Sequence, residues 1–119
     1  MNIEDYRNYC LSKKGVTEST PFSKAANILV FKVGGKMFTA TDIDTFESFS
    51  VKCAPSSIPD LRERYEAVQA PAYLSKKHWN KVVMDDSIPK SILHEWLDLS
   101  YDLVVAKLTK KEREELESL

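Results

Sequence analysis

A pair of glycines, Gly34-Gly35, constrains the fold of this chain more than any other feature of its sequence. The pair separates two apolar runs, residues 28–33 and 36–41, in which β-branched and aromatic residues are frequent. A two-residue hairpin turn needs positive φ at its central positions, and glycine adopts positive φ without steric cost. The spacing therefore predicts an antiparallel hairpin in which Val33 pairs with Lys36.

The same register sorts the hairpin residues onto two faces. It places Phe31 opposite Phe38 and Leu29 opposite Ala40, so we expect these four side chains on the core face. The other face would meet water or a partner, and it carries Val30, Lys32, Met37, Thr39 and Thr41.

The remaining patterns predict further strands and helices around this hairpin. Phe49, Val51 and Cys53 alternate with polar residues, as in a half-buried strand, and we expect another strand over residues 79–84. Apolar spacings of three and four indicate a helix over the first fourteen residues and a long helix from Ser87. The long helix has two apolar ladders: Ile92, Trp96, Leu99 and Leu103, and beside them Leu93, Leu97, Val104 and Leu108.

Helix starts are marked by residues that can cap free backbone amides. The expected capping residues are Asn2, Ser57 with Asp60, Ser87, and Thr109 with Glu112. With 119 residues, the chain fits a single α+β domain spanning 1–119, an antiparallel sheet packed by helices.

Charge is distributed unevenly along a chain whose formal net charge is only -1. No Asp or Glu occurs from Ser19 to Thr41 or from Ala67 to Met84, and each stretch holds three lysines. Any affinity for a polyanion must come from such local clustering. Strands also disfavour Asp and Glu, so chance composition remains the alternative to a basic surface.

The segment 73–84 is the strongest functional candidate. It places Lys76, Lys77 and Lys81 beside His78, Trp79 and Asn80, without any carboxylate. Cations attract an anionic partner over long range, and a flat indole offers a stacking surface. Together with the hairpin lysines Lys32 and Lys36, these residues form the expected nucleic-acid or anion site.

Each residue of this segment also has a purely structural interpretation. The lysines would then be a solvated turn, and Trp79 would be a core anchor between sheet and helix. His78 would stabilise the turn by a hydrogen bond, and Asn80 would bond the backbone of that turn. For Trp79, His78 and Asn80 the structural interpretation is the preferred one.

Other functional classes receive little support. Cys10 and Cys53 lack metal-ligand or Cys-x-x-Cys spacing, and Asp42 with Asp44 has no third ligand. No nucleophile motif or glycine-rich phosphate loop occurs, so we expect no catalytic residue, cofactor or metal and no enzyme. No apolar run reaches the length of a membrane span, and the N-terminus has no leader pattern, so a cytoplasmic location is expected.

Several blocks in order resemble the MmcQ/YjbR family over nearly the whole chain. They are Leu29–Phe38, Val51–Cys53, Lys76–Asn80 and Ser100–Leu108. The resemblance implies a CyaY-like (frataxin-like) arrangement with a double-wing surface, and members are described as putative DNA-binding proteins. It implies no catalytic residue, and the first helix lacks the acidic ridge that iron binding uses in frataxin relatives.

The resulting hypothesis is a nonenzymatic DNA-binding domain that uses the lysine-rich surface of the sheet and the Lys76–Asn80 turn. The alternative is a module that binds a small anionic ligand or a protein partner through the same surface. Either hypothesis requires that the hairpin lysines and the 73–84 lysines lie on one side of the molecule.

Overall fold

The glycine hairpin forms as expected. In the computed structural model, which describes all 119 residues, β2 (Ile28–Val33) and β3 (Lys36–Asp42) are joined by Gly34 and Gly35. The two glycines have φ of +58° and +75°. The pairing of Val33 with Lys36 is confirmed.

A β-bulge makes the rest of the predicted register wrong. Beyond the bulge, each residue of β2 lies opposite a residue one position further along β3 than expected, so Phe31 faces Thr39 and Leu29 faces Thr41. Phe38 is the extra residue, and both Phe38 and Thr39 are fully buried. A bulge lets two successive side chains approach the same face, which alternation alone does not allow. Thr39 and Thr41 therefore belong to the core side.

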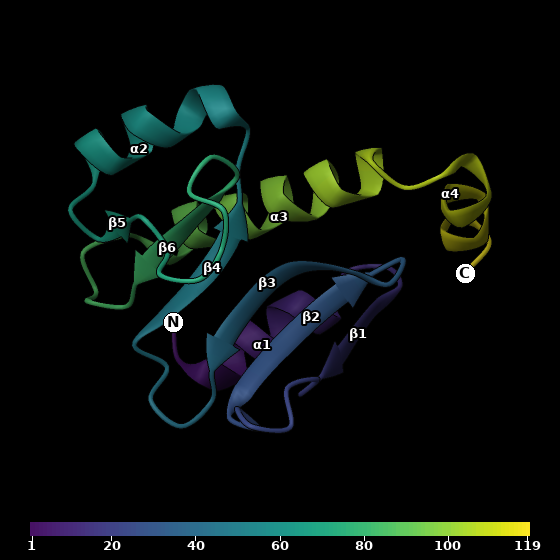
Figure 1. Cartoon of the computed structure of the whole chain (residues 1–119), viewed down its shortest axis with the longest axis horizontal. Helices are drawn as coiled ribbons and strands as arrows, with labels where there is room; N and C mark the ends of the chain where they lie inside the picture. The colour runs from purple at the N-terminus through teal and green to yellow at the C-terminus, as the bar shows by residue number, and fades with distance from the viewer.

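Six antiparallel strands form one sheet in the order β1-β2-β3-β4-β6-β5 (Figure 1). The strands predicted around residues 49–53 and 79–84 are present as β4 (Ser48–Lys52) and β6 (Trp79–Val83). The edge strands β1 (Val16–Ser19) and β5 (Val68–Gln69) were not predicted.

Four α-helices complete an α+β fold. In Figure 1, α1 (Ile3–Leu11) and α3 (Lys90–Ala106) lie behind the sheet, on the same face. A 3-10 turn, η1 (Pro55–Ser57), leads into α2 (Ile58–Arg64), and α4 (Lys110–Glu117) ends the chain. The core between sheet and helices holds Tyr6 and Cys10 of α1, Leu93 and Leu97 of α3, and the inward residues of the strands, which include Phe31, Phe38, Phe49, Val51 and Val82.

Two of the predicted helix caps are confirmed and two are wrong. Asn2 and Thr109 each form a reciprocal capping box, with Asp5 and Glu112 respectively. Ser57 gives no cap, because its hydroxyl donates to the Ala54 carbonyl at 2.8 Å. Ser87 lies outside α3, which begins at Lys90, and its hydroxyl bonds Asp85 instead.

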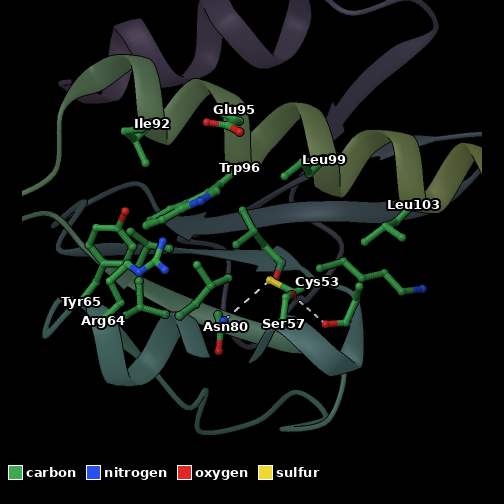
Figure 2. Close-up of a pocket in the computed structure, with 16 residues that line it drawn as sticks. Cys53, Ser57, Arg64, Tyr65, Asn80, Ile92, Glu95, Trp96, Leu99 and Leu103 are labelled. Atoms are coloured by element: carbon green, nitrogen blue, oxygen red, sulfur yellow. Dashed lines mark hydrogen bonds between the residues drawn. The ribbon is translucent and has the colours of Figure 1, made fainter. Parts of the chain in front are cut away.

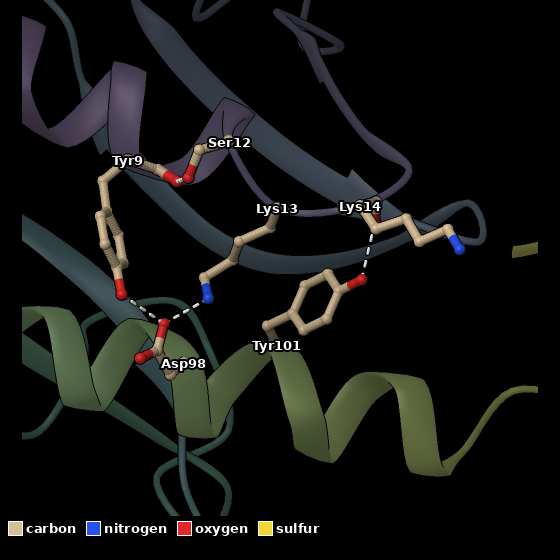
Figure 3. A network of polar contacts seen from close by, with 6 residues as sticks. All are labelled: Tyr9, Ser12, Lys13, Lys14, Asp98 and Tyr101. Carbon is tan, nitrogen blue, oxygen red and sulfur yellow. Dashed lines mark hydrogen bonds and ion pairs between the residues drawn. The ribbon is translucent and has the colours of Figure 1, made fainter. Parts of the chain in front are cut away.

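Polar contacts join α1 and the residues that follow it to α3 (Figure 3). The Tyr9 hydroxyl donates to Asp98 Oδ1 at 2.7 Å, and the Lys13 ammonium pairs with the same oxygen. The Tyr101 hydroxyl donates to the Lys14 carbonyl at 2.7 Å. Because these partners are about 90 residues apart in sequence, the contacts fix α3 relative to the first helix.

Ser100 holds α3 against the sheet next to the bulge. Its side chain is fully buried, and its hydroxyl donates to the Phe38 carbonyl at 2.5 Å. The same oxygen accepts from the Lys52 backbone N–H at 2.8 Å. The ladder between β3 and β4 ends at the pair Thr39–Val51, so Ser100 bonds the backbone groups just beyond the last strand pair. None of the helices has the length and apolar character needed to cross a membrane.

Candidate functional site

Strand register assigns the lysines to a face. Residues paired across an antiparallel sheet point to the same side, so Val30, Ala40, Ser50 and Lys81 form one row. The side chains adjacent to this row along the strands belong to the core, so the row faces away from α1 and α3. We call this side the outer face; its strand residues are Thr17, Ser19, Ile28, Val30, Lys32, Met37, Ala40, Asp42, Ser48, Ser50, Lys52, Gln69, Trp79, Lys81 and Val83.

Three lysines from three strands share the outer face. Lys32 lies on β2, Lys52 on β4 and Lys81 on β6, and all three are half-buried. The strands that carry Lys32 and Lys81, β2 and β6, are about 14 Å apart across the sheet, because three strand spacings of about 4.8 Å separate them. Asp42 is the only carboxylate on this face, and it accepts a hydrogen bond from Asn27 Nδ2 at 2.7 Å.

The turn before β6 adds exposed cations beside this face. Lys76, Lys77 and His78 are exposed, and they directly precede Trp79, the first residue of β6. The Ser75 carbonyl accepts from the backbone N–H groups of His78 and Trp79 at 3.2 and 3.0 Å. The expected hydrogen bond that stabilises the turn is therefore made by the His78 backbone, and its imidazole extends into solvent.

Trp79 does not anchor the core, so the preferred structural interpretation of this residue was wrong. Trp79 pairs with Lys52 on the outer face, where it is half-buried and outside the core cluster. The tryptophan in the core is Trp96 of α3, which is 9% exposed and meets Tyr65 edge-to-face at 5.1 Å. The indole of Trp79 therefore lies among the lysines of the outer face.

Lys36 is not part of the outer face. It pairs with Val33, whose side chain is fully buried in the core, so the register places Lys36 on the helix side of the hairpin. Hydrogen bonds from Thr109 lower the pKa of Glu112, and Lys36 contributes to the same shift, so Lys36 lies near the acidic α4. The hairpin thus contributes one of its two predicted lysines to the site.

Asn80 is also on the wrong side for the predicted role. It is fully buried and points inward between Trp79 and Lys81, as strand alternation requires. Arg62 Nε donates to Asn80 Oδ1 at 2.8 Å, and Asn80 Nδ2 contacts Cys53 Sγ at 3.7 Å. Asn80 therefore reaches neither a partner on the outer face nor the backbone of the turn. Its amide oxygen accepts from the Arg62 side chain of α2 instead.

Asn80 lies in a pocket on the helix side of the sheet (Figure 2). The pocket has a volume of about 530 Å³, and its floor is formed by inward residues of β4, β6 and β5. Its walls are α2 and α3, and eleven of the sixteen lining residues are hydrophobic, which makes it a mainly apolar cavity. Burial raises the pKa of the Cys53 thiol, so Cys53 at the pocket floor is not an activated nucleophile.

The sequence-based reasoning missed Lys52 and the pocket. The alternation of Ser48, Ser50 and Lys52 with buried residues already indicated that Lys52 lies opposite the core. The two apolar ladders of α3 together form a wider stripe than a helix needs to cover one sheet, and the ladder that includes Ile92 and Leu99 lines the pocket.

Comparison with known proteins identifies relatives of the whole chain. The family model described as YjbR matches residues 11–103. The Escherichia coli K12 protein named "Uncharacterized protein YjbR" is 30% identical, with 100% of each chain covered. "Uncharacterized protein YbdF" of Escherichia coli O157:H7 is 27% identical over 71% of this chain and 70% of its own.

Solved structures share the fold. The Deinococcus radiodurans protein DR2400, with a DUF419 domain, superimposes with a TM-score of 0.89 at 35% identity, covering 98% of this chain and 88% of the other. A Pseudomonas syringae protein gives a TM-score of 0.75 at 19% identity, with coverages of 87% and 98%, which bears on the fold alone. The family match over most of the chain and the full-length relative agree with each other. The chain therefore belongs to the YjbR family.

Proposed function

We propose that this protein is a nonenzymatic DNA-binding domain whose contact surface is the outer face of the sheet and the turn before β6. The observation that carries the proposal is the presence of Lys32, Lys52 and Lys81 on one face, with Trp79 among them and a single carboxylate. Cations that share a surface attract phosphates together, and an indole adds a stacking or packing platform.

The alternation of short and long side chains on the outer face supports contact with a nucleic-acid backbone. In the row from Val30 to Lys81, Ala40 and Ser50 have short side chains, and Lys32 lies two residues further along β2. Half-buried lysines can lay their methylene stems on the sheet while the ammonium groups remain in water. The separation of about 14 Å between β2, which carries Lys32, and β6, which carries Lys81, is similar to the width of the DNA major groove, about 12 Å.

Binding through this surface should depend strongly on salt. With Lys76 and Lys77 added to the three sheet lysines, about five phosphates would be neutralised, which gives a slope of log K against log salt of roughly -4. Because the net charge of the chain is -1, the rest of the molecule adds no attraction of its own. The affinity must then come from this one face.

The proposal extends to the class of the fold and to the place where the protein acts. Helices on one side of an antiparallel sheet, with cations on the other side, suit a CyaY-like (frataxin-like) double-wing arrangement. A location in the cytoplasm, where DNA is accessible in a bacterial cell, accompanies this function. The raised pKa of Cys53 supports a binding role over thiol catalysis.

Charge reversal at two outer-face positions tests the proposal. The variant K32E/K81E changes two lysines from different strands, and K110E/K111E makes the same charge change on α4, where both residues are exposed. Fluorescence anisotropy with a labelled duplex at two salt concentrations measures binding, and circular dichroism verifies the fold. K32E/K81E should lose binding while K110E/K111E keeps it. Equal loss in both variants, or wild-type binding that does not depend on salt, would reject the outer face as a DNA-binding surface.

The near-neutral net charge favours one alternative, a small anionic ligand or a protein partner on the same outer face, because dedicated DNA-binding domains are commonly basic overall. Thermal-shift measurements with nucleotides and phosphorylated metabolites separate the two. Stabilisation that K32E/K81E abolishes, without any duplex binding by the wild type, would assign the surface to a small anion.

A further inference from the structure

The pocket on the helix side is a separate site from the outer face. Val51, Asn80 and Val82 form its floor, and they point to the opposite side of β4 and β6 from Lys52 and Lys81. The thickness of the sheet therefore divides the two surfaces, except at the end of β4, where Lys52 also borders the pocket. A ligand in the pocket would not compete directly with a partner on the outer face.

The walls of the pocket are apolar and contain an exposed leucine. Trp96 and Tyr65 form an edge-to-face aromatic pair in it, with ring centroids 5.1 Å apart. Leu99 of α3 lines the same cavity and is 51% exposed, although the neighbouring ladder of α3 is in the core. A volume of about 530 Å³ lies within the range of cavities that enclose small organic molecules. The body of a fitting ligand is therefore hydrophobic.

Positive charge without a carboxylate partner lies beside this apolar space. Arg62 donates to three neutral oxygens, those of the Asn80 side chain and of the Lys76 and Trp79 backbone, and it forms no ion pair. Arg64 lines the pocket without any ion pair or hydrogen bond, and Figure 2 shows its guanidinium beside the Tyr65 ring, turned toward α3. Besides Lys52, which the register assigns to the outer face, the charged residues of the lining are Arg64 and a single acid, Glu95.

Asn80 supplies a buried donor that lacks a good acceptor. Arginine has only donors, so the Arg62 contact fixes the Asn80 oxygen toward α2 and the amide nitrogen toward the pocket. In Figure 2 the Asn80 oxygen is turned away from α3. The two N–H groups of Nδ2 have one contact, to Cys53 Sγ at 3.7 Å, and sulfur is a weak acceptor. A fully buried amide in this state is ready to donate to a ligand oxygen.

We propose that this pocket binds a small hydrophobic carboxylate, with its apolar body against Trp96, Tyr65 and Leu99. The carboxylate pairs with Arg64, and Asn80 Nδ2 donates to one of its oxygens. The apolar lining selects the body of the ligand, and the cation and the amide select its charge. Binding is noncovalent, because the neighbouring Cys53 remains protonated.

The two tryptophans allow a direct test. Trp79 is on the outer face, and Trp96 lines the pocket, so the variant W79F leaves an indole that reports on the pocket alone. Titration of W79F with 4-phenylbutyrate should give a saturable change in Trp96 emission. The uncharged analogue 4-phenylbutyramide should bind about tenfold more weakly, as expected when a hydrogen bond between charged groups is lost.

Substitution of the arginine tests the charge requirement. R64Q in the W79F background should raise the dissociation constant of 4-phenylbutyrate about tenfold and leave that of the amide unchanged. R113Q, an exposed arginine on α4, is the matched control and should leave both constants unchanged. L99E places a negative charge at a partly exposed position of the pocket wall and should weaken binding of the acid more than binding of the amide.

The proposal would be overturned by any of several results. The first is the absence of a saturable response up to about 10 mM acid, because a dissociation constant above this concentration would be too weak for specific binding. The second is equal affinity for the acid and the amide. The third is that R64Q binds the acid as tightly as R113Q does. Self-association of the chain that buries Trp96, seen by sedimentation, would assign the pocket to a second copy instead. Since DNA binding is measured separately with K32E/K81E, failure of one proposal leaves the other intact.

Discussion

Replacing Ser100 by alanine should lower the free energy of unfolding by about 2–5 kcal/mol. The hydroxyl bonds two backbone groups, the Phe38 carbonyl and the Lys52 N–H, where Ser100 is 0% exposed. Each buried polar group left without a partner costs about 1–3 kcal/mol, and alanine returns a few tenths through better helix propensity. With an entropy of unfolding of about 2.1 cal/mol/K per residue, the loss corresponds to a fall in melting temperature of roughly 8–20 °C.

Urea unfolding followed by circular dichroism measures this change. S91A is the control, because Ser91 is an exposed serine in the first turn of the same helix and carries the same propensity gain. S91A should shift stability by no more than about 0.5 kcal/mol. A loss of less than about 0.5 kcal/mol in S100A would refute the reasoning. It would mean that Phe38 and Lys52 find other partners without the hydroxyl.

The remaining predictions concern the hairpin and a half-buried histidine. G34A should lower the free energy of unfolding more than G35A does. Both glycines have positive φ, but a Cβ at Gly34 would lie 2.6 Å from Leu108, whereas Gly35 faces open space. The backbone strain alone should cost about 1–2 kcal/mol in each variant, and urea unfolding measures the difference. Equal losses would show that Leu108 moves aside freely. Burial lowers the pKa of His94, whose Nε2 has no partner, so the unfolded chain takes up the proton first and stability should fall as pH drops through about 6.5. H94F, which keeps a ring stacked on Tyr9, should remove this fall between pH 7.5 and about 5.5 in melting temperatures, and an unchanged profile would assign it to other groups.

The hairpin shows which part of the fold local sequence determines. Gly34-Gly35 defines the turn and its first pair, because positive φ is a local requirement that these residues meet. The bulge at Phe38 could not be predicted, since no glycine marks it and its cause is tertiary. It allows Phe38 and Thr39 to enter the core together, where the Thr39 hydroxyl bonds Tyr6 at 2.8 Å.

The candidate sites divide in the same way. Strand alternation alone places Asn80 on the opposite face of β6 from Trp79 and Lys81. The prediction that all three residues share one surface was therefore inconsistent with the strand predicted for residues 79–84. Which of Trp79 and Trp96 is in the core depends on the face that α3 covers, and this is a long-range property. The pocket depends on the position of α2 beside α3, and no local pattern determines that position.

The order of the strands has a consequence for how this molecule can associate. The strands at the two borders, β1 and β5, have four and two residues, so few unpaired backbone groups are available for an incoming strand. Short borders of this kind discourage the strand-by-strand growth that leads to aggregates. Partners are therefore left with the broad surfaces of the sheet and its helices, where side chains determine recognition.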